Sequence, residues 1–244
     1  MKRLNVKMQC FESLDSTNAQ LKKLAARGAA EGTLVIANAQ TGGKGRMGRS
    51  FYSPPGLGVY MSLLLRPDAS PDGVQSLTAF CAVAVCMAIE KLTKLKPEIK
   101  WVNDILLDGK KICGILCESA VNENGTDYVV LGIGLNVITR TEDFPPPLRE
   151  TAGSLYSQSG QVFERGRLIS AIVEELDAML CAWEKDRTAY LEDYRRRCPM
   201  PGSYVAVGGR DAIVERIEPD FGLRVRYPDG VSEVLHSGEV SLNK

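Results

Sequence analysis

Residues 42–49 read Gly-Gly-Lys-Gly-Arg-Met-Gly-Arg and lie between two apolar runs at 33–39 and 59–65. Both runs are typical of buried strands, so residues 42–49 should form the loop that joins them. The glycines allow backbone conformations that expose successive N–H groups, and three cations add positive charge. This pattern predicts an anion site, although a solvated basic loop fits it equally well. Neither a Walker A ending nor the three-glycine dinucleotide pattern is present.

The segments around this loop predict an α+β fold. Residues 6–14 alternate as a half-buried strand does, and residues 15–18 (Asp-Ser-Thr-Asn) offer helix-capping side chains. A helix is expected over 19–27, and it should stop at Gly28. A second, long helix is expected to begin at residues 70–72 because a proline follows a serine there.

An antiparallel meander is predicted beyond this helix. Three strand-like runs at 98–107, 111–119 and 127–137 are separated by Asp108-Gly109 and Asn124-Gly125. Both dipeptides are strong hairpin signals.

The sequence pattern changes from helical to strand-like at Pro199. Before it, residues 167–197 are expected to be helical, with a break near 186–187. After it come short strand-like runs with glycine turns, which are typical of a small barrel. The sequence therefore predicts two domains, 1–199 and 200–244.

The composition narrows the function classes. Thirty basic and thirty acidic residues cancel, so no overall field recruits nucleic acid or an anionic membrane. A single histidine, His236, argues against hydrolytic triads and histidine-rich metal sites. The seven cysteines form no Cys-x-x-Cys pair, which suits buried thiols in a reducing cytosol. The longest apolar run, 79–89, is shorter than the roughly 20 residues that span a bilayer.

Two further segments carry chemistry. Residues 100–104 (Lys-Trp-Val-Asn-Asp) gather a lysine, an amide and a carboxylate at a strand end, although such residues also occur at solvated edges and turns. Residues 131–137 place Gly132 and Gly134 in an apolar strand, where they indicate either a bulge or a close approach to the backbone.

Taken together, four motifs in this order resemble the biotin protein ligase family. They are Ser-Thr-Asn at 16–18, the glycine- and arginine-rich loop at 43–49, Lys-Trp-Val-Asn-Asp at 100–104, which corresponds to the family's Lys-Trp-Pro-Asn-Asp motif, and the Gly-x-Gly-x-Asn strand at 132–136. The resemblance covers nearly the whole chain.

The resemblance implies a class II synthetase-like mixed or antiparallel sheet with flanking helices, followed by a small C-terminal SH3-like β-barrel. It also implies a two-step activity. ATP and biotin would give biotinyl-5′-AMP and pyrophosphate with the help of Mg²⁺. The biotinyl group would then pass to one lysine of a biotin carboxyl carrier protein of a carboxylase.

Family roles transfer to individual residues by motif position. Lys100 and Arg46 would be catalytic and stabilise charge, and Asp104 would help to place Mg²⁺. The residues expected to bind biotin are Ser16, Thr17, Asn18, Gln40, Lys44, Gly45, Arg46 and Lys100. The residues expected to bind ATP or the adenylate are Arg46, Arg49, Phe51, Asn103, Lys111 and Asn136.

Three positions depart from the family pattern. Lys44 stands where arginine is usual and Met47 where another basic residue is common, so the bidentate grip on phosphate is expected to be weaker. Val102 replaces proline and removes a rigid φ constraint before Asn103.

Partners and alternatives complete the expectations. The first strand begins soon after Met1, so we expect no N-terminal DNA-binding domain. The balanced charge, the short apolar runs and the unpaired cysteine pattern lead us to expect no nucleic-acid or membrane partner and a cytoplasmic enzyme. Homodimer formation is left open. A lipoate or octanoate protein ligase, or a non-catalytic biotin-binding protein, would share much of this sequence pattern. Trp101 and the glycine-basic loop favour biotin.

Overall fold

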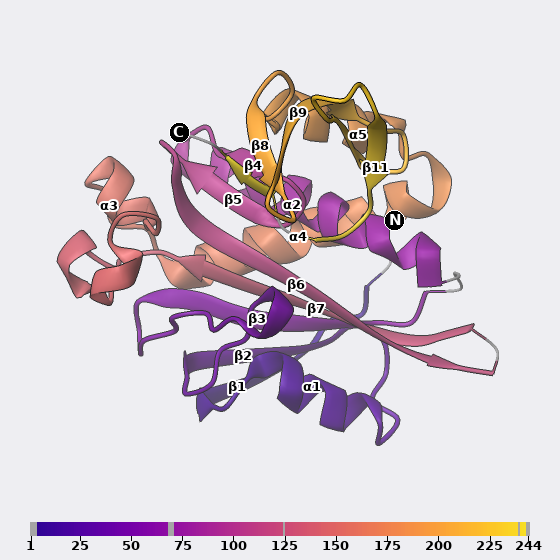
Figure 1. Ribbon diagram of the computed structural model, residues 1–244. Helices are drawn as coiled ribbons and strands as arrows, with labels where there is room; N and C mark the ends of the chain where they lie inside the picture. Colours follow the sequence, from indigo (N-terminus) through magenta and orange to yellow (C-terminus); the bar gives the residue numbers. More distant parts are fainter. Residues whose placement is uncertain (1–3, 68–70, 124, 239, 243–244) are drawn as a thin grey trace.

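The computed structural model describes residues 4–67, 71–123, 125–238 and 240–242 (Figure 1). Its main element is a seven-stranded mixed sheet in which β1 and β2 run parallel and the other neighbouring pairs run antiparallel. In spatial order the strands are β1 (Lys7–Leu14), β2 (Thr33–Gln40), β3 (Gly58–Leu65), β7 (Gly125–Asn136), β6 (Lys110–Asn122), β5 (Asp104–Leu107) and β4 (Glu98–Lys100). This sheet confirms the predicted α+β fold and the meander.

Helices cover both faces of this sheet. They are α1 (Thr17–Ala25), α2 (Pro71–Thr93), α3 (Leu155–Ser159), α4 (Arg165–Lys185) and α5 (Thr188–Arg197), with short 3₁₀ turns at Arg46–Gly48, Thr141–Asp143 and Pro146–Leu148. Successive strand residues point to opposite faces. On β3, Leu63 packs in the large core with α2 and α4, whereas Leu64 packs in a smaller core with Leu21 of α1. The sheet therefore separates α1 on one face from α2 and α4 on the other.

Helix boundaries follow local signals closely. Ser16 caps α1, since its side-chain oxygen accepts a hydrogen bond from the backbone N–H of Ala19 at 3.4 Å. The helix begins two residues earlier than expected and ends at Ala25. The predicted break near Asp186 is confirmed, because the Asp186 carboxylate accepts from the N–H of Thr188 at 2.9 Å between α4 and α5. Two predicted positions lie outside the described residues: Ser70 at the predicted start of the long helix, and Asn124 in the predicted second hairpin turn.

Helix α2 lies inside the protein. Residues Ser76–Thr93 are long and apolar enough to cross a membrane, but 72% of this window is buried among the other elements. A core helix of a water-soluble fold has the same composition.

The prediction of one strand over 98–107 is wrong. The chain reverses between β4 and β5, and Lys100 pairs with Asp104 across the turn. The cause is tertiary: Trp101 is buried, its backbone N–H contacts the sulfur of Met200 at 3.2 Å, and its indole N–H donates to the carbonyl of Phe221 at 2.8 Å. These contacts draw the turn toward the C-terminal segment.

The C-terminal segment forms a five-stranded antiparallel sheet. Its order is β11 (Ser232–Leu235), β10 (Leu223–Arg226), β9 (Arg210–Ile217), β8 (Tyr204–Val207) and β12 (Val240–Leu242). Within the described residues the pairings leave β11 and β12 at its two edges rather than closing a barrel. The ring of Phe221 lies 5.1 Å from that of Phe80 on α2, so this sheet shares the main core. The boundary near residue 200 stays a prediction.

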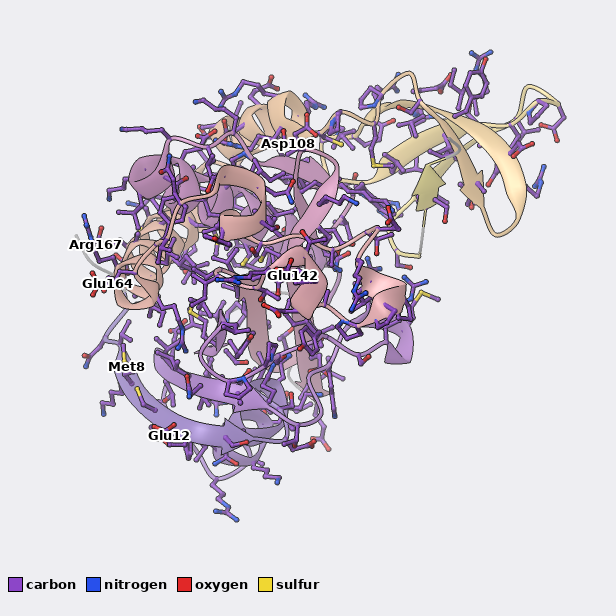
Figure 2. The ribbon with its side chains drawn as sticks, turned by 90° about the vertical axis from the view of Figure 1, so that its left-hand side faces the viewer. Met8, Glu12, Asp108, Glu142, Glu164 and Arg167 are labelled. Atoms are coloured by element: carbon purple, nitrogen blue, oxygen red, sulfur yellow. The ribbon has the colours of Figure 1, made fainter. Side chains whose placement is uncertain are left out.

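Figure 2 shows the same arrangement from the side. The C-terminal sheet projects at one end of the molecule, and the edge strand β1, with Met8 and Glu12 exposed, lies at the other end.

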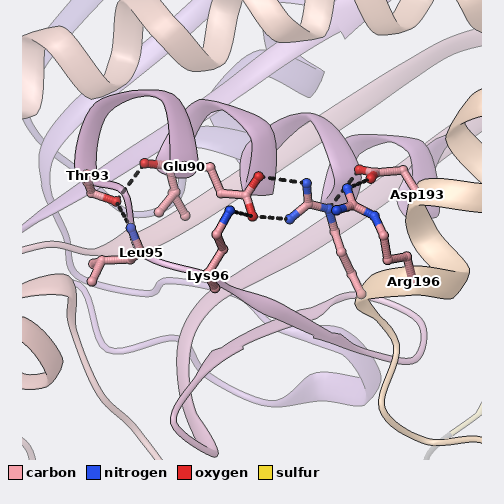
Figure 3. Close-up of polar contacts among 8 residues, drawn as sticks. Glu90, Thr93, Leu95, Lys96, Asp193 and Arg196 are labelled. Atoms are coloured by element: carbon pink, nitrogen blue, oxygen red, sulfur yellow. Dashed lines mark hydrogen bonds and ion pairs between the residues drawn. The ribbon is translucent and has the colours of Figure 1, made fainter.

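A buried ion network joins α2 to α5 (Figure 3). The guanidinium of Arg197, of which 5% is exposed, donates to both carboxylate oxygens of Glu90 at 2.8 and 2.9 Å and to Asp193 at 2.7 Å. Lys96 and Arg196 add ion pairs to the same two carboxylates. Bidentate geometry of this kind fixes the relative placement of the two helices.

Candidate active site

One pocket collects the motifs that the sequence singled out. Its walls come from the start of α1, the loop after β2, the turn between β4 and β5, and the middle of β6 and β7. Of the predicted site residues, those that line it are Ser16, Thr17, Asn18, Gln40, Lys44, Gly45, Arg46, Arg49, Phe51, Lys100, Asn103, Asp104 and Lys111. Residues far apart in sequence therefore meet at one site.

One end of this pocket is a buried polar network. Ser16, Thr17 and Asn18 are 3%, 4% and 4% exposed. The carbonyl oxygen of the Gln40 side chain accepts from the backbone N–H of Thr17 at 2.8 Å, and the Gln40 amide nitrogen donates to Ser53 at 2.9 Å. Because both ends of the Gln40 amide are engaged, its orientation is fixed.

This network is short of hydrogen-bond donors. Ser62 Oγ lies 2.6 Å from Asn18 Oδ1 and 2.8 Å from Thr17 Oγ1, and Thr17 Oγ1 lies 3.1 Å from Gln40 Oε1. Each hydroxyl has one hydrogen, while the two amide oxygens have none. Three oxygen–oxygen contacts thus share two hydrogens. When Ser62 donates to Asn18 Oδ1, Thr17 Oγ1 accepts no hydrogen bond within the network, so an N–H donor on a ligand suits this end of the pocket.

The other end of the pocket is cationic. The loop at 42–49 folds toward the β4–β5 turn, where Arg46 Nη1 donates to Asn103 Oδ1 at 3.0 Å. Within the loop, the N–H of Gly45 donates to the carbonyl of Arg49 at 2.7 Å, and Lys44 forms a β-bridge with Ser50. The tip residue Met47 is 73% exposed at φ 54°.

Two lysines, Lys100 and Lys111, also line this pocket. Lys111 Nζ pairs with Asp104 Oδ1 at 2.7 Å, and both side chains are largely buried. Lys100 lines the pocket and is half-buried, and it pairs with Asp104 across the turn between β4 and β5. With Arg46 these lysines can stabilise negative charge that develops beside a bound anion.

The glycines of β7 make room for protein side chains. A Cβ on Gly132 would lie 2.1 Å from Asn18 Oδ1, and a Cβ on Gly134 would lie 2.6 Å from the Phe51 ring. Gly114 on β6 also lies beneath Phe51, 3.4 Å from its ring by the same construction. The close approach suggested by the sequence is therefore by Asn18 and Phe51, which both line the pocket.

Other glycines pack at the base of the loop. A Cβ on Gly42 would lie 2.2 Å from Asp15 Oδ1, and one on Gly43 would lie 2.4 Å from the Phe51 carbonyl. Their freedom from a side chain thus lets the loop start close to its neighbours.

Asn136 lies outside the pocket lining. It is buried, and its side-chain N–H donates to the carbonyl of Gly153 at 2.9 Å. Gly153 in turn donates to the carbonyl of Lys111. Asn136 therefore contacts the segment that supports Lys111, and its predicted contact with adenine stays a prediction.

Sequence reasoning missed several contributors. Ser62 belongs to the polar network, Gly114 lies under Phe51, and Gly238 and Val240 of the C-terminal segment line the pocket. Ser62 reads as one polar residue in an apolar strand, and that is the only signal that it carried.

The cysteines take no part in the site chemistry. All seven are thiols, and four of them are buried. Burial raises the pKa of Cys117 to about 12 and that of Cys198 to about 11. Such thiols are not nucleophilic near neutral pH.

Fold and pocket together define a class of protein whose mixed sheet carries one pocket with a buried polar network and a group of basic side chains. Residues 10–136 match the Biotin/lipoate A/B protein ligase family. The Biotin--[acetyl-CoA-carboxylase] ligase of Mycobacterium tuberculosis is 34% identical over 234 residues, which cover 92% of this chain and 85% of that protein. The chain belongs to this family.

Other relatives carry further names. The Bifunctional ligase/repressor BirA of Bacillus subtilis is 44% identical over 160 residues, 66% of this chain. The chain spans about half, 49%, of the length of that protein. The solved structure of biotin protein ligase from Aquifex aeolicus in complex with biotin and ATP matches with a TM-score of 0.84 and 26% identity, covering 98% of this chain and 99% of that one.

Proposed function

We propose that this protein activates biotin with ATP and transfers the biotinyl group to a lysine of a carboxylase's biotin carboxyl carrier protein. The observation that carries the proposal is the pocket itself, in which a donor-poor polar end and a cationic loop face one cavity. The relatives named as biotin--[acetyl-CoA-carboxylase] ligases support the same substrate and carrier.

The first step joins two substrates. A carboxylate oxygen of biotin attacks the α-phosphorus of ATP, the bond to the bridging oxygen breaks, and pyrophosphate leaves. Lys100, Lys111 and Arg46 would hold the carboxylate and the phosphate together and offset the charge that develops between them. The ureido N–H groups of biotin would donate into the network around Thr17 and Asn18.

The second step uses a nucleophile from the partner. The amine of a carrier lysine attacks the biotinyl carbonyl, AMP leaves with the bonding electron pair, and the amine loses a proton. No enzyme nucleophile is needed, which agrees with the raised pKa values of the buried thiols.

Mg²⁺ fits this site as a companion of the nucleotide. The described residues contain no cluster of three or more His, Cys, Asp or Glu side chains that could hold a metal alone. Mg²⁺ commonly binds through one carboxylate and substrate phosphates, and Asp104 would supply that carboxylate. When bound, the ion would neutralise phosphate charge.

Lipoate is the nearest alternative substrate within the family. Its dithiolane ring has no N–H group, so it could not donate a hydrogen bond to Thr17 Oγ1, which accepts none within the network once Ser62 donates to Asn18. A site built to hydrogen-bond a substrate strongly rejects an analogue that lacks those groups. The polar end therefore favours biotin.

The wider setting is part of the proposal. We infer a cytoplasmic enzyme that works without nucleic acid or membrane. A homodimer is compatible with this function, and the function does not depend on it. Balanced charge supports the absence of a nucleic-acid partner.

Carrier labelling tests the proposal. The protein is incubated with ATP, Mg²⁺, biotin and a biotin carrier domain, and streptavidin then detects label on the carrier. Label that needs both ATP and the carrier lysine is expected. A carrier labelled by lipoate but not by biotin would contradict the biotin assignment, and no label from either would contradict the ligase activity.

Gly132→Ala should weaken biotin binding. The new methyl group would meet Asn18 Oδ1, which Ser62 holds in place, so the polar end must shift. We expect the KM for biotin to rise at least about 10-fold with an unchanged KM for ATP. Gly166→Ala is the matched control, since its Cβ would meet no atom closer than 3.9 Å. Equal biotin KM values for the two variants would contradict the packing described here.

Limited trypsin digestion should report on the loop at 42–49. Lys44, Arg46 and Arg49 offer cleavage sites beside the exposed tip at Met47. We expect cutting there in the absence of substrates and at least about 10-fold slower cutting with biotin and ATP, because bound anions restrain the loop. Identical cutting rates in both conditions would argue against an ordering of this loop by substrates.

A further inference from the structure

The amide of Asn18 is held at both ends. Its nitrogen donates to Glu118 Oε2 at 2.8 Å and to the carbonyl of Leu116 at 3.3 Å, and its oxygen accepts from Ser62 at 2.6 Å. A carboxylate and a carbonyl can only accept hydrogen bonds. They therefore force the NH₂ group of Asn18 toward β6 and its oxygen toward Ser62.

This orientation decides whether Thr17 Oγ1 accepts a hydrogen bond within the network. Since Asn18 Oδ1 accepts, the single hydroxyl hydrogen of Ser62 points to it. Thr17 then has one hydrogen for its two contacts with Ser62 and Gln40. If the amide were reversed, Asn18 would donate to Ser62, Ser62 to Thr17, and Thr17 to Gln40. Thr17 Oγ1 would then accept from Ser62 and would have less capacity to accept a hydrogen bond from a substrate.

Glu118 prevents that reversal. A reversed amide would place Asn18 Oδ1 against the Glu118 carboxylate and the Leu116 carbonyl, all of them acceptors. Burial raises the pKa of Glu118, but hydrogen bonds from Lys22 and Asn18 and the nearby charge of Lys44 together lower it by more. The net pKa is therefore below its usual value, and the carboxylate stays ionised. Lys22 on α1 pairs directly with the other oxygen of this carboxylate.

We propose that Glu118, held by Lys22, is a positioning residue that keeps the Asn18 amide in the orientation that leaves Thr17 Oγ1 free to accept a hydrogen bond from a substrate. Neither Glu118 nor Lys22 is among the residues that line the pocket, so they act through Asn18. The ion pair thereby makes the pocket accept hydrogen bonds from substrate N–H groups. This inference rests on the proposed function and adds the residues that set its specificity.

Glu118→Gln is the direct test. Glutamine keeps the volume but can donate to a reversed Asn18, in which case Ser62 would donate to Thr17 Oγ1 in place of the substrate. In steady-state adenylate formation we expect the KM for biotin to rise about 10-fold, with the KM for ATP and kcat within about twofold of the wild type. The discrimination between biotin and lipoate in kcat/KM should fall by a similar factor.

Substitutions of Lys22, whose side chain is more exposed than that of Glu118, provide a second test. Lys22→Met should raise the biotin KM about threefold, and Lys22→Arg should restore it, because arginine keeps the charge. Lys91→Met is the matched control, since it removes an ion pair with Glu174 between α2 and α4, elements whose residues do not line the pocket. If Glu118→Gln fails to fold, the two Lys22 variants decide.

The outcomes separate this inference from the proposed function. If the wild-type protein does not form biotinyl-adenylate, the proposed function fails. If it does, but Glu118→Gln and Lys22→Met keep the wild-type KM for biotin, only the positioning role fails. A parallel rise in the KM values for biotin and ATP would also overturn it, because it would show general damage.

Discussion

Lys100→Ala should lower the rate of biotinyl-adenylate formation at least about 100-fold, which corresponds to roughly 2.7 kcal/mol of transition-state stabilisation. Lys100 lines the pocket at the end of β4, beside the turn that carries Asn103 and Asp104. Its ammonium group would face charge that develops as the carboxylate approaches the α-phosphate. The rate of single-turnover adenylate formation measures the effect, and the fold should be unchanged because Lys100 is only half-buried.

Two companion variants make this test specific. Lys23→Ala removes an exposed lysine of α1 that does not line the pocket, and it should have the wild-type rate. Lys111→Ala removes the lysine that pairs with Asp104, and it should also be slow. A fast Lys100→Ala beside a slow Lys111→Ala would contradict the role given to Lys100 and transfer it to Lys111.

Arg197→Met should lower the free energy of unfolding by about 3 kcal/mol, because it leaves two partly buried carboxylates without their main partner. Arg197 joins Glu90 of α2 to Asp193 of α5 (Figure 3). Urea denaturation at neutral pH measures the change. Arg167→Met, which removes an exposed arginine of α4, should change stability by less than about 0.5 kcal/mol.

The pH dependence gives this prediction a second check. Hydrogen bonds from Arg197 lower the pKa of Glu90; burial raises the pKa of Asp193, but bonds from Arg196 and Arg197 lower it more. Groups with a lowered pKa in the folded state stabilise it above their unfolded pKa values, about 4.3 and 3.9. That stability is lost as the pH falls below these values. The difference between wild type and Arg197→Met should shrink there, and a constant difference down to about pH 3 would contradict the network's role.

The sequence predicted best what depends on neighbouring residues. The cap at Ser16, the loop at 42–49 and the turn at Asp108-Gly109 are local signals, and each produces the expected element. Most of the site residues that were predicted from the family resemblance line one pocket.

Long-range contacts account for what the sequence did not show. Glu118 contacts Asn18 from 100 residues away, and Trp101 turns the chain because Phe221, 120 residues further on, accepts its indole N–H. Periodicity carries no information about such pairs. The orientation of the Asn18 amide, on which the specificity argument depends, exists only when β6, β3 and α1 are assembled.

The most direct measurement is the specificity of ATP–pyrophosphate exchange. The wild-type protein is given ATP, Mg²⁺, labelled pyrophosphate and either biotin or lipoate, and kcat/KM is determined for each acid. We expect exchange that depends on biotin, with a preference over lipoate of at least about 10³-fold, because only biotin supplies N–H donors to the polar end of the pocket. Equal values for the two acids, or exchange with lipoate alone, would contradict it.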